Sequence, residues 1–364
     1  MMHIPIAQPR ADTDEIDAVT RVLRSGMFAQ GPVVAEFEKK FARYCGVRNA
    51  IAVNSGTAAL HAAVASAGIG PGDEVIVPTF SFIATASCVS LCGAQPVFAD
   101  VDPAYFTLDP EAVRKLFSPR TKAVIGVHLF GQPFDIDPLR EMCSDHDALL
   151  IEDAAQAHGS IYKGKKVGGF GAAGCFSFYP TKNMTTGEGG MVTTDNNEYA
   201  AKIRRFINHG QSEKYLHTSL GYNYRMTDIG GAIGVAQLAK LDGFNKRRLH
   251  NADYFDRHLK AKGLVLPARR KDCTHVFHQY VVRVTKDCSL SREQLMEALK
   301  KKGIGTAVHY PIPIHRQPVY KPVTANTRCP VAEELAEQVM SLPVHPQVTD
   351  EQLKYICDTL NGMI

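Results

Sequence analysis

Apolar segments alternate with helical segments through residues 50–206 of this 364-residue chain. Each apolar run is short enough for a buried strand, and a turn then leads into a segment whose apolar residues recur at helical spacing. This alternation predicts an α/β fold built on an open sheet. The strands are expected at residues 50–53, 74–78, 96–99, 122–127, 148–151, 174–177 and 190–194, and helices at residues 58–67, 83–92, 110–117, 137–145 and 195–206, after two earlier helices at residues 12–25 and 33–45.

The segment from Gly174 to Val192 contains the strongest chemical signal. It is a strand, a turn that carries Lys182, a glycine-rich turn and a second strand. Burial between strands favours the neutral form of a lysine amine. A neutral amine on a rigid scaffold can form a Schiff base with an aldehyde, and pyridoxal phosphate (PLP) is the common one. The alternative is a surface-loop lysine beside a glycine turn.

A glycine turn joins the strand at residues 50–53 to the alanine-rich helix at residues 58–67. The turn reads Asn54-Ser55-Gly56-Thr57. Free backbone amides and the helix dipole make such a junction an anion site, and Gly56 allows close approach. The hydroxyls of Ser55 and Thr57 can add donors. The alternative is an ordinary helix cap, since serine and threonine are favoured there.

An acidic pair follows the apolar run at residues 148–151. Glu152 and Asp153 stand at the carboxyl end of this strand, where open α/β sheets bind ligands. A carboxylate there can hold a protonated ring nitrogen. Strand alternation places the two side chains on opposite faces, and Asp153 is the one expected to face the ligand. A helix cap or a structural salt bridge is the alternative.

Two further residues stand at strand ends. Phe82 can stack on a flat ring, although an aromatic at a strand–helix junction also suits a core position. Ser177 lies five residues before Lys182, and its hydroxyl can reach a phosphate. A buried serine bonded to backbone is the alternative for Ser177.

Composition excludes several classes of protein. The net charge is only +4, so neither nucleic acid nor a membrane is expected as a partner. The nine cysteines contain no C-x-x-C pair and are expected to be reduced thiols in a cytoplasmic protein. The N-terminus lacks a signal-peptide pattern, and no apolar run is long enough to span a bilayer. His309 and His315, separated by prolines and without nearby carboxylates, make a poor ligand pattern, so no metal is expected.

The pattern changes in the last third of the chain. Helices at residues 228–239 and 244–262 are expected, with the second linking to another unit. The division is placed between a large domain at residues 1–243 and a small α+β domain at residues 244–364. The small domain is expected to contain a strand at residues 277–284, helices at residues 291–302, 331–340 and 349–361, and a proline- and histidine-rich segment that cannot be a regular helix or central strand.

These motifs together resemble the DegT/DnrJ/EryC1/StrS family of PLP-dependent nucleotide-sugar aminotransferases. The resemblance covers essentially the whole chain, and it rests on the order and spacing of seven sequence motifs. The motifs are Gln30-Gly31-Pro32 before Phe37-Glu38, Asn54 to Leu60, Pro78 to Thr85, Glu152 to Gln156, Ser177 to Gly190, Gly221 to Met226, and His309 to Tyr320.

The resemblance implies a fold of the aspartate-aminotransferase type (fold type I), with a large domain on a mainly parallel sheet. It implies that Lys182 bonds covalently to PLP and shuttles a proton, and that Asp153 pairs with the ring nitrogen. The remaining cofactor contacts would be Gln156 to the ring oxygen, Phe82 on the ring face, Gly56, Thr57 and Ser177 around the phosphate, and Asn223 reaching the phosphate of a neighbouring subunit. His309, Tyr310 and His315 would border the substrate pocket.

The implied activity is transfer of an amino group from L-glutamate to a 3- or 4-keto group of a nucleotide-linked hexose, in glycan biosynthesis, by a homodimer with shared active sites. Three alternatives remain. A sugar dehydratase of the same family would usually have histidine in place of Lys182. A same-fold lyase would act on an amino acid. A PLP-binding regulator without catalysis would be favoured by loss of Lys182 or Asp153, and both are present.

Overall fold

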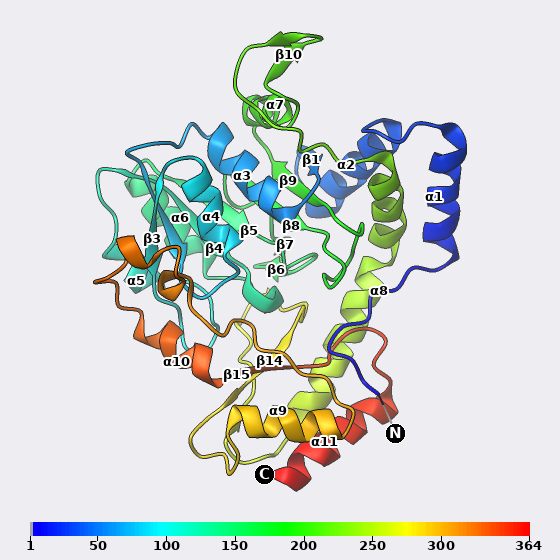
Figure 1. Ribbon diagram of the computed structural model, residues 1–364, viewed down its shortest axis with the longest axis vertical. Coiled ribbons are helices and arrows are strands. Elements are labelled where there is room, and N and C mark those ends of the chain that lie inside the picture. Colours follow the sequence, from blue (N-terminus) through cyan, green and yellow to red (C-terminus); the bar gives the residue numbers. More distant parts are fainter. Residues whose placement is uncertain (1–2) are drawn as a thin grey trace.

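A seven-stranded sheet forms the centre of the larger part of the computed structural model, which describes residues 3–364 (Figure 1). Its strand order is β1-β9-β8-β5-β4-β2-β3, and only the pairings of β9 with β1 and β8 are antiparallel. The predicted α/β class and mainly parallel sheet are therefore confirmed. The strands are β1 (Asn49–Val53), β2 (Glu74–Pro78), β3 (Gln95–Ala99), β4 (Thr121–Val127), β5 (Leu149–Asp153), β8 (Ala173–Ser177) and β9 (Gly190–Thr194).

Helices cover both faces of this sheet, because successive strand residues point to opposite sides. On β1, Ile51 and Val53 join the core cluster beneath one set of helices, whereas Ala50 and Ala52 join the cluster on the other face. The first face is covered by α3 (Gly56–Ser66), α4 (Ala84–Leu91) and α7 (Asn197–Phe206). The second is covered by α2 (Pro32–Cys45), α5 (Pro110–Arg114), α6 (Ile136–Asp145) and the first half of α8 (Asp228–His258), against which α1 (Thr13–Ser25) also packs.

The helix α8 corrects one prediction. Two helices were expected at residues 228–239 and 244–262, but α8 is continuous from Asp228 to His258. Gly243 lies between the two expected helices, but a single glycine costs a helix only about 1 kcal/mol. Packing against α1 and α2 at one end and α11 at the other offsets that cost. In Figure 1, α8 runs from the large sheet down into the smaller part of the molecule.

The smaller part contains an antiparallel sheet of three strands in the order β12-β14-β15. Its core also takes in Phe255 from α8 and Ile4 from the N-terminal segment, which bridges to Ile304. The expected division at residues 243/244 falls inside α8, so it does not coincide with a break in secondary structure. The elements are β12 (Leu264–Val265), β14 (Tyr280–Val284), β15 (Val339–Leu342), α9 (Arg292–Lys301), α10 (Pro330–Gln338) and α11 (Asp350–Met363).

Two helices end earlier than the sequence predicts, and several short strands and turns were not predicted. The helix expected at residues 331–340 ends at Gln338, because Val339–Leu342 form the buried strand β15 beside β14. The helix expected at residues 110–117 ends at Arg114. The short pieces are β6 (Ile161–Tyr162), β7 (Lys165–Lys166), β10 (Gln211–Glu213), β11 (Leu216–His217), β13 (Cys273–Thr274), and the 3-10 turns η1 (Leu129–Gly131), η2 (Ile314–Arg316) and η3 (Lys321–Val323). Among residues 3–364, none of the helices has the length and apolar character needed to cross a bilayer.

Candidate active site

A cavity of about 590 Å³ opens at the carboxyl edge of the parallel strands, between the large sheet and the smaller part. This edge is where open α/β sheets bind ligands. The segments that follow β2, β4, β5 and β8 all contribute to its wall. The predicted site residues that line it are Gly56, Thr57, Phe82, Asp153, Gln156, Ser177, Lys182, His309 and Tyr310.

Lys182 stands in the turn after β8, and its backbone N–H donates to the carbonyl of Tyr179 at 2.9 Å. The residue is partly exposed to the cavity. Burial around its amine lowers the pKa from 10.5 to about 8, against the opposing effect of the negative charge on Asp153. A substantial fraction of the amine is therefore neutral at mildly alkaline pH. The two residues line the same cavity without a direct hydrogen bond in the described residues.

Asp153 is the last residue of β5, and its side chain is held by two donors. Thr85 Oγ1 donates to Oδ2 at 2.9 Å, and the N–H of Ala155 donates to Oδ1 at 3.1 Å. Burial raises the pKa of Asp153, while these donors and the charge of Lys182 act in the opposite direction. The carboxylate is therefore oriented into the cavity and sensitive to any cation placed there.

Glu152 faces the other side of the sheet, as strand alternation predicts. It is fully buried, accepts N–H bonds from Gly168 (2.8 Å) and Phe170 (2.7 Å), and pairs with His128 at 3.1 Å. Burial alone would raise the pKa of Glu152, but these partners lower it. Glu152 thus fixes the loop before β8 and takes no part in lining the cavity.

The N-terminus of α3 forms the anion cradle expected from the sequence. Ser55 is the cap, and its Oγ accepts the N–H of Ala58 at 3.1 Å. The amides of Gly56 and Thr57 precede the first hydrogen bonds of the helix and face the cavity. A Cβ on Gly56 would lie 2.6 Å from the Cβ of Ser177, so only glycine lets α3 approach the end of β8 this closely. Cradle amides and the Ser177 hydroxyl are thereby brought together.

Gln156 links two distant segments at the wall of the cavity. Its Oε1 accepts the N–H of Phe130 at 2.7 Å, and its Nε2 donates to the hydroxyl of Tyr310 at 2.9 Å. The Tyr310 ring lies 6.2 Å from that of Phe82, at an angle of 42°. Phe82 itself is 54% exposed, so one face of its ring is free for a ligand.

Two predicted residues lie outside this cavity. The side chain of Asn223 is exposed, beside a backbone bridge to Asn208. His315 is buried, with Nδ1 bonded to Thr79 and Nε2 3.0 Å from Glu333. Its expected contact with substrate is not supported, because both ring nitrogens are already engaged in holding η2 between β2 and α10.

The sequence reasoning missed several residues of the wall. Thr85 lies behind the wall and orients Asp153; it belongs to the Pro78 to Thr85 motif, in which only Phe82 was given a role. His278 and Gln279 precede β14 and carry no motif, so no local signal marks them. Phe130, Tyr179 and Glu188 also line the cavity.

Comparison with known proteins gives a consistent result. Residues 9–361 match the model of the DegT/DnrJ/EryC1/StrS aminotransferase family. A GDP-perosamine synthase of Caulobacter vibrioides is 40% identical over 100% of this chain and 98% of its own length. The dTDP-3-amino-3,4,6-trideoxy-alpha-D-glucose transaminase of Streptomyces venezuelae is 40% identical over 96% of this chain and 92% of its own.

A solved structure agrees with these relatives. The crystal structure of S. venezuelae DesV in complex with a ketimine intermediate superposes with a TM-score of 0.95, at 38% identity, over 100% of this chain and 98% of that one. These similarities agree with the fold and with the placement of Lys182 and Asp153 in one cavity. This chain belongs to the DegT/DnrJ/EryC1/StrS aminotransferase family.

Proposed function

We propose that this chain is a PLP-dependent aminotransferase that moves an amino group from L-glutamate to a keto group of a nucleotide-linked sugar. The observation that carries the proposal is the cavity shared by Lys182, Asp153 and the free amides of α3. The two similar enzymes described above support it, since their names refer to a GDP-linked and a dTDP-linked sugar.

The donor set of the cavity fits PLP. The amides of Gly56 and Thr57 and the hydroxyl of Ser177 suit a phosphate at a helix N-terminus. Lys182 offers an amine of lowered pKa for an aldehyde, and Asp153 offers a carboxylate for a ring nitrogen. Phe82 has a free ring face, and we assign the amide of Gln156 to the ring oxygen.

When bound, PLP supplies an electron-withdrawing ring that accepts the negative charge left when a proton leaves the donor carbon. Lys182 is the proposed base: its pKa of about 8 lets it both accept and return a proton near neutral pH. Asp153 would stabilise a positive charge on the ring nitrogen. Thr85 and Ala155 hold its carboxylate toward the cavity and oppose the effect of burial, which raises its pKa. Phe82, together with the cradle of α3, limits the orientations that a flat, phosphorylated ligand can adopt.

We propose the wall near His309 and Tyr310 as the site of the sugar nucleotide. The hydrogen bond from Gln156 holds Tyr310 in place. A movement of Gln156 would therefore also move Tyr310, and a movement of Tyr310 would move Gln156. Burial lowers the pKa of His309, so it is neutral at physiological pH and can donate or accept a hydrogen bond to a sugar hydroxyl.

We also propose a homodimer in which Asn223 completes the site of the partner subunit. Asn223 is exposed and does not line its own cavity, and the neighbouring hairpin β10–β11 projects from the body of the molecule (Figure 1). Exposed apolar side chains at Tyr215 and Leu220 suit a protein interface. The nine free cysteines suit a reducing compartment, and we place the protein in the cytoplasm.

An absorbance experiment tests the activity. The purified protein incubated with PLP should show the visible band of a lysine-bound cofactor, and L-glutamate should bleach it. A panel of UDP-, dTDP- and GDP-linked keto sugars should then restore the band with the correct substrate. Absence of the band, or a band that L-glutamate leaves unchanged, would contradict the proposal.

A further inference from the structure

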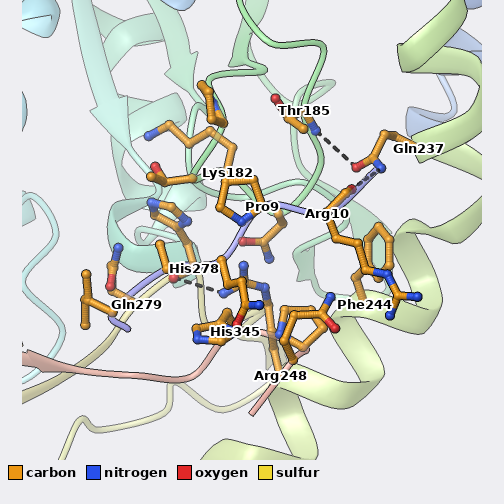
Figure 2. A pocket seen from close by; sticks show the side chains of 18 residues that line it. Pro9, Arg10, Lys182, Thr185, Gln237, Phe244, Arg248, His278, Gln279 and His345 are labelled. Carbon is orange, nitrogen blue, oxygen red and sulfur yellow. Dashed lines mark hydrogen bonds between the residues drawn. The ribbon is translucent and has the colours of Figure 1, made fainter. Parts of the chain in front are cut away.

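A second, smaller cavity adjoins Lys182 on the side of the N-terminal segment. Figure 2 shows its wall, which comes from residues 6–10, the turn after β8, α8, the segment before β14 and the segment after β15. It shares Thr181, Lys182, His278 and Gln279 with the larger cavity, so the two spaces meet at the lysine. Its volume is about 40 Å³. One water needs about 10–15 Å³, so the space suits a group of a few heavy atoms and excludes a nucleotide.

The wall of this small cavity is rich in positive charge. Lys182, Arg10 and Arg248 line it, together with the amide side chains of Asn183 and several glutamines. None of its lining residues is an aspartate or a glutamate. The two histidines of the wall, His278 and His345, are kept neutral because burial lowers the pKa of each. The wall of the small cavity therefore carries positive charge without a carboxylate of its own, and Asp153, whose charge acts on Lys182, lines the larger cavity instead.

Arg248 is the most deeply buried of these positive charges and has no carboxylate partner in the described part of the chain. It is only 4% exposed, and its Nη1 donates to the carbonyls of Phe277 and His278, both at 3.1 Å. Its Nε has no hydrogen-bond partner, and no carboxylate pairs with it among residues 3–364. Buried charges are normally paired, because removing an ion from water is costly. Burial accordingly lowers the pKa of Arg248 to about 9.

The preceding residue shows the contrast on the same helix. Arg247 is partly exposed and donates to Asp350 and to the carbonyl of Val348, at 2.7 and 2.6 Å. Its charge is compensated by a carboxylate of the protein. The unpaired charge of Arg248 is thus a property of its cavity rather than of this part of α8.

We propose that Arg248 binds one carboxylate of the amino donor in this small cavity, while the amine of the donor lies at Lys182. The inference rests on the proposed function, and it assigns a binding residue for the donor half of the reaction. A guanidinium provides the strong, directional hydrogen bonds that a carboxylate accepts. L-Glutamate carries two carboxylates, and the volume admits one of them, leaving the rest of the molecule in the larger cavity. Arg10, which is exposed, stands at the edge of the small cavity and adds to its positive charge.

The test compares Arg248→Gln, Arg248→Lys and Arg10→Gln with the matched control Arg247→Gln, all in the PLP-loaded enzyme. Two quantities are measured: KM and kcat for L-glutamate, from steady-state turnover with the keto sugar that the panel identifies as acceptor, and the dissociation constant of glutarate, a dicarboxylate without an amine, from calorimetry. We expect Arg248→Gln to raise both the KM and the glutarate constant by about 10- to 100-fold, with a smaller change in kcat. Arg248→Lys should fall between this variant and the wild type. Arg10→Gln should have a several-fold effect, and Arg247→Gln none.

Several outcomes would overturn the inference. A folded Arg248→Gln variant with KM and glutarate affinity within about twofold of the wild type would do so. If that variant does not fold, unchanged constants in both Arg248→Lys and Arg10→Gln would do so instead. Sulfate serves as a second ligand: if Arg248→Gln weakens sulfate binding but leaves glutarate binding unchanged, the cavity takes inorganic anions and the donor assignment is wrong. A wild-type enzyme that does not respond to L-glutamate would contradict the proposed function itself, whereas a response independent of Arg248 contradicts only this inference.

Discussion

At the scale of single residues, burial of ionisable groups shapes this site. Lys182 and Asp153 line one cavity, and each perturbs the other through its charge. Burial favours the neutral form of both, while their mutual attraction favours the charged forms. The balance leaves an amine that can lose its proton near pH 8 and a carboxylate whose ionisation depends on its neighbours.

The reactivity of Lys182 should therefore follow an unusual pH dependence. Only a neutral amine reacts with an acylating reagent, and the pKa of Lys182 is lowered from 10.5 to about 8. In the cofactor-free protein, labelling of Lys182 should rise with pH around a midpoint near 8, as followed by peptide mass spectrometry. Asp153→Asn should move this midpoint lower, because the negative charge of Asp153 stabilises the protonated amine. A midpoint near the ordinary lysine value would show that the amine is not buried in solution.

Replacing the carboxylate should separate cofactor binding from chemistry. Asp153→Asn keeps the size of the side chain but removes the charge that stabilises a protonated ring nitrogen. We expect PLP to remain bound and kcat for amino transfer to fall by about 10²–10³-fold. Glu152→Gln is the matched control: it should lower the free energy of unfolding, because Glu152 is buried among four partners, but leave kcat within a few-fold. A near-normal rate in Asp153→Asn would mean that another group pairs with the ring nitrogen.

At the scale of elements, the site depends on how closely α3 approaches the end of β8. The alanine-rich helix packs on the sheet with small side chains, and Gly56 brings its first amides against Ser177. The cradle is thus a packing feature as much as a sequence motif. Strand β5 and the turn after β8 then place Asp153 and Lys182 on the same edge.

Gly56→Ala should damage this cradle. The added methyl group would lie 2.6 Å from the Cβ of Ser177, so α3 or β8 must shift. We expect a loss of about 1–3 kcal/mol in the free energy of unfolding and weaker binding of PLP, measured by urea denaturation and by cofactor titration. Gly243→Ala is the control, because a Cβ there meets no atom within 4 Å in the described part of the chain. It should be neutral or stabilising by up to about 1 kcal/mol. Equal effects of the two substitutions would contradict the role of the close approach.

At the scale of the whole molecule, one helix connects the two parts and a projecting hairpin leaves apolar side chains uncovered. Tyr215 is 82% exposed and Leu220 is 93% exposed, although both are large and apolar. Large apolar side chains left this exposed are typical of surfaces that pair with another protein. A second copy of the chain is the proposed partner, and a two-fold dimer is the most common arrangement.

Shared active sites predict complementation between inactive variants. Lys182→Ala should abolish amino transfer, because the lysine supplies chemistry, while far-ultraviolet circular dichroism stays unchanged. Asn223→Ala should be strongly impaired if the partner site needs this side chain. After the two variants are unfolded together and refolded at equal amounts, about half of the dimers contain one copy of each, and one of their two sites is intact. Activity should therefore recover to about a quarter of the wild-type value. No recovery, together with a heterodimer detected by mass spectrometry, would show that Asn223 acts within its own subunit.

Much of the site could be predicted from the sequence because its signals are local. The strand before Asp153, the glycine turn at residues 54–57 and the turn carrying Lys182 each specify their own geometry within a few residues. The carboxyl edge of a parallel sheet then collects them without further information. The choice of Asp153 over Glu152 followed from strand alternation alone, and the structure places only Asp153 on the cavity.

The sequence by itself determined the α/β class, the family and the polar residues at the centre of the main cavity, because hydrophobic period and turn chemistry act over short distances. Only the tertiary structure decided that α8 is one helix, that His315 is turned toward Glu333, and that Arg248 faces a cavity without acids. Each of these outcomes depends on packing between segments that lie far apart in the chain, and such packing leaves no local pattern to read.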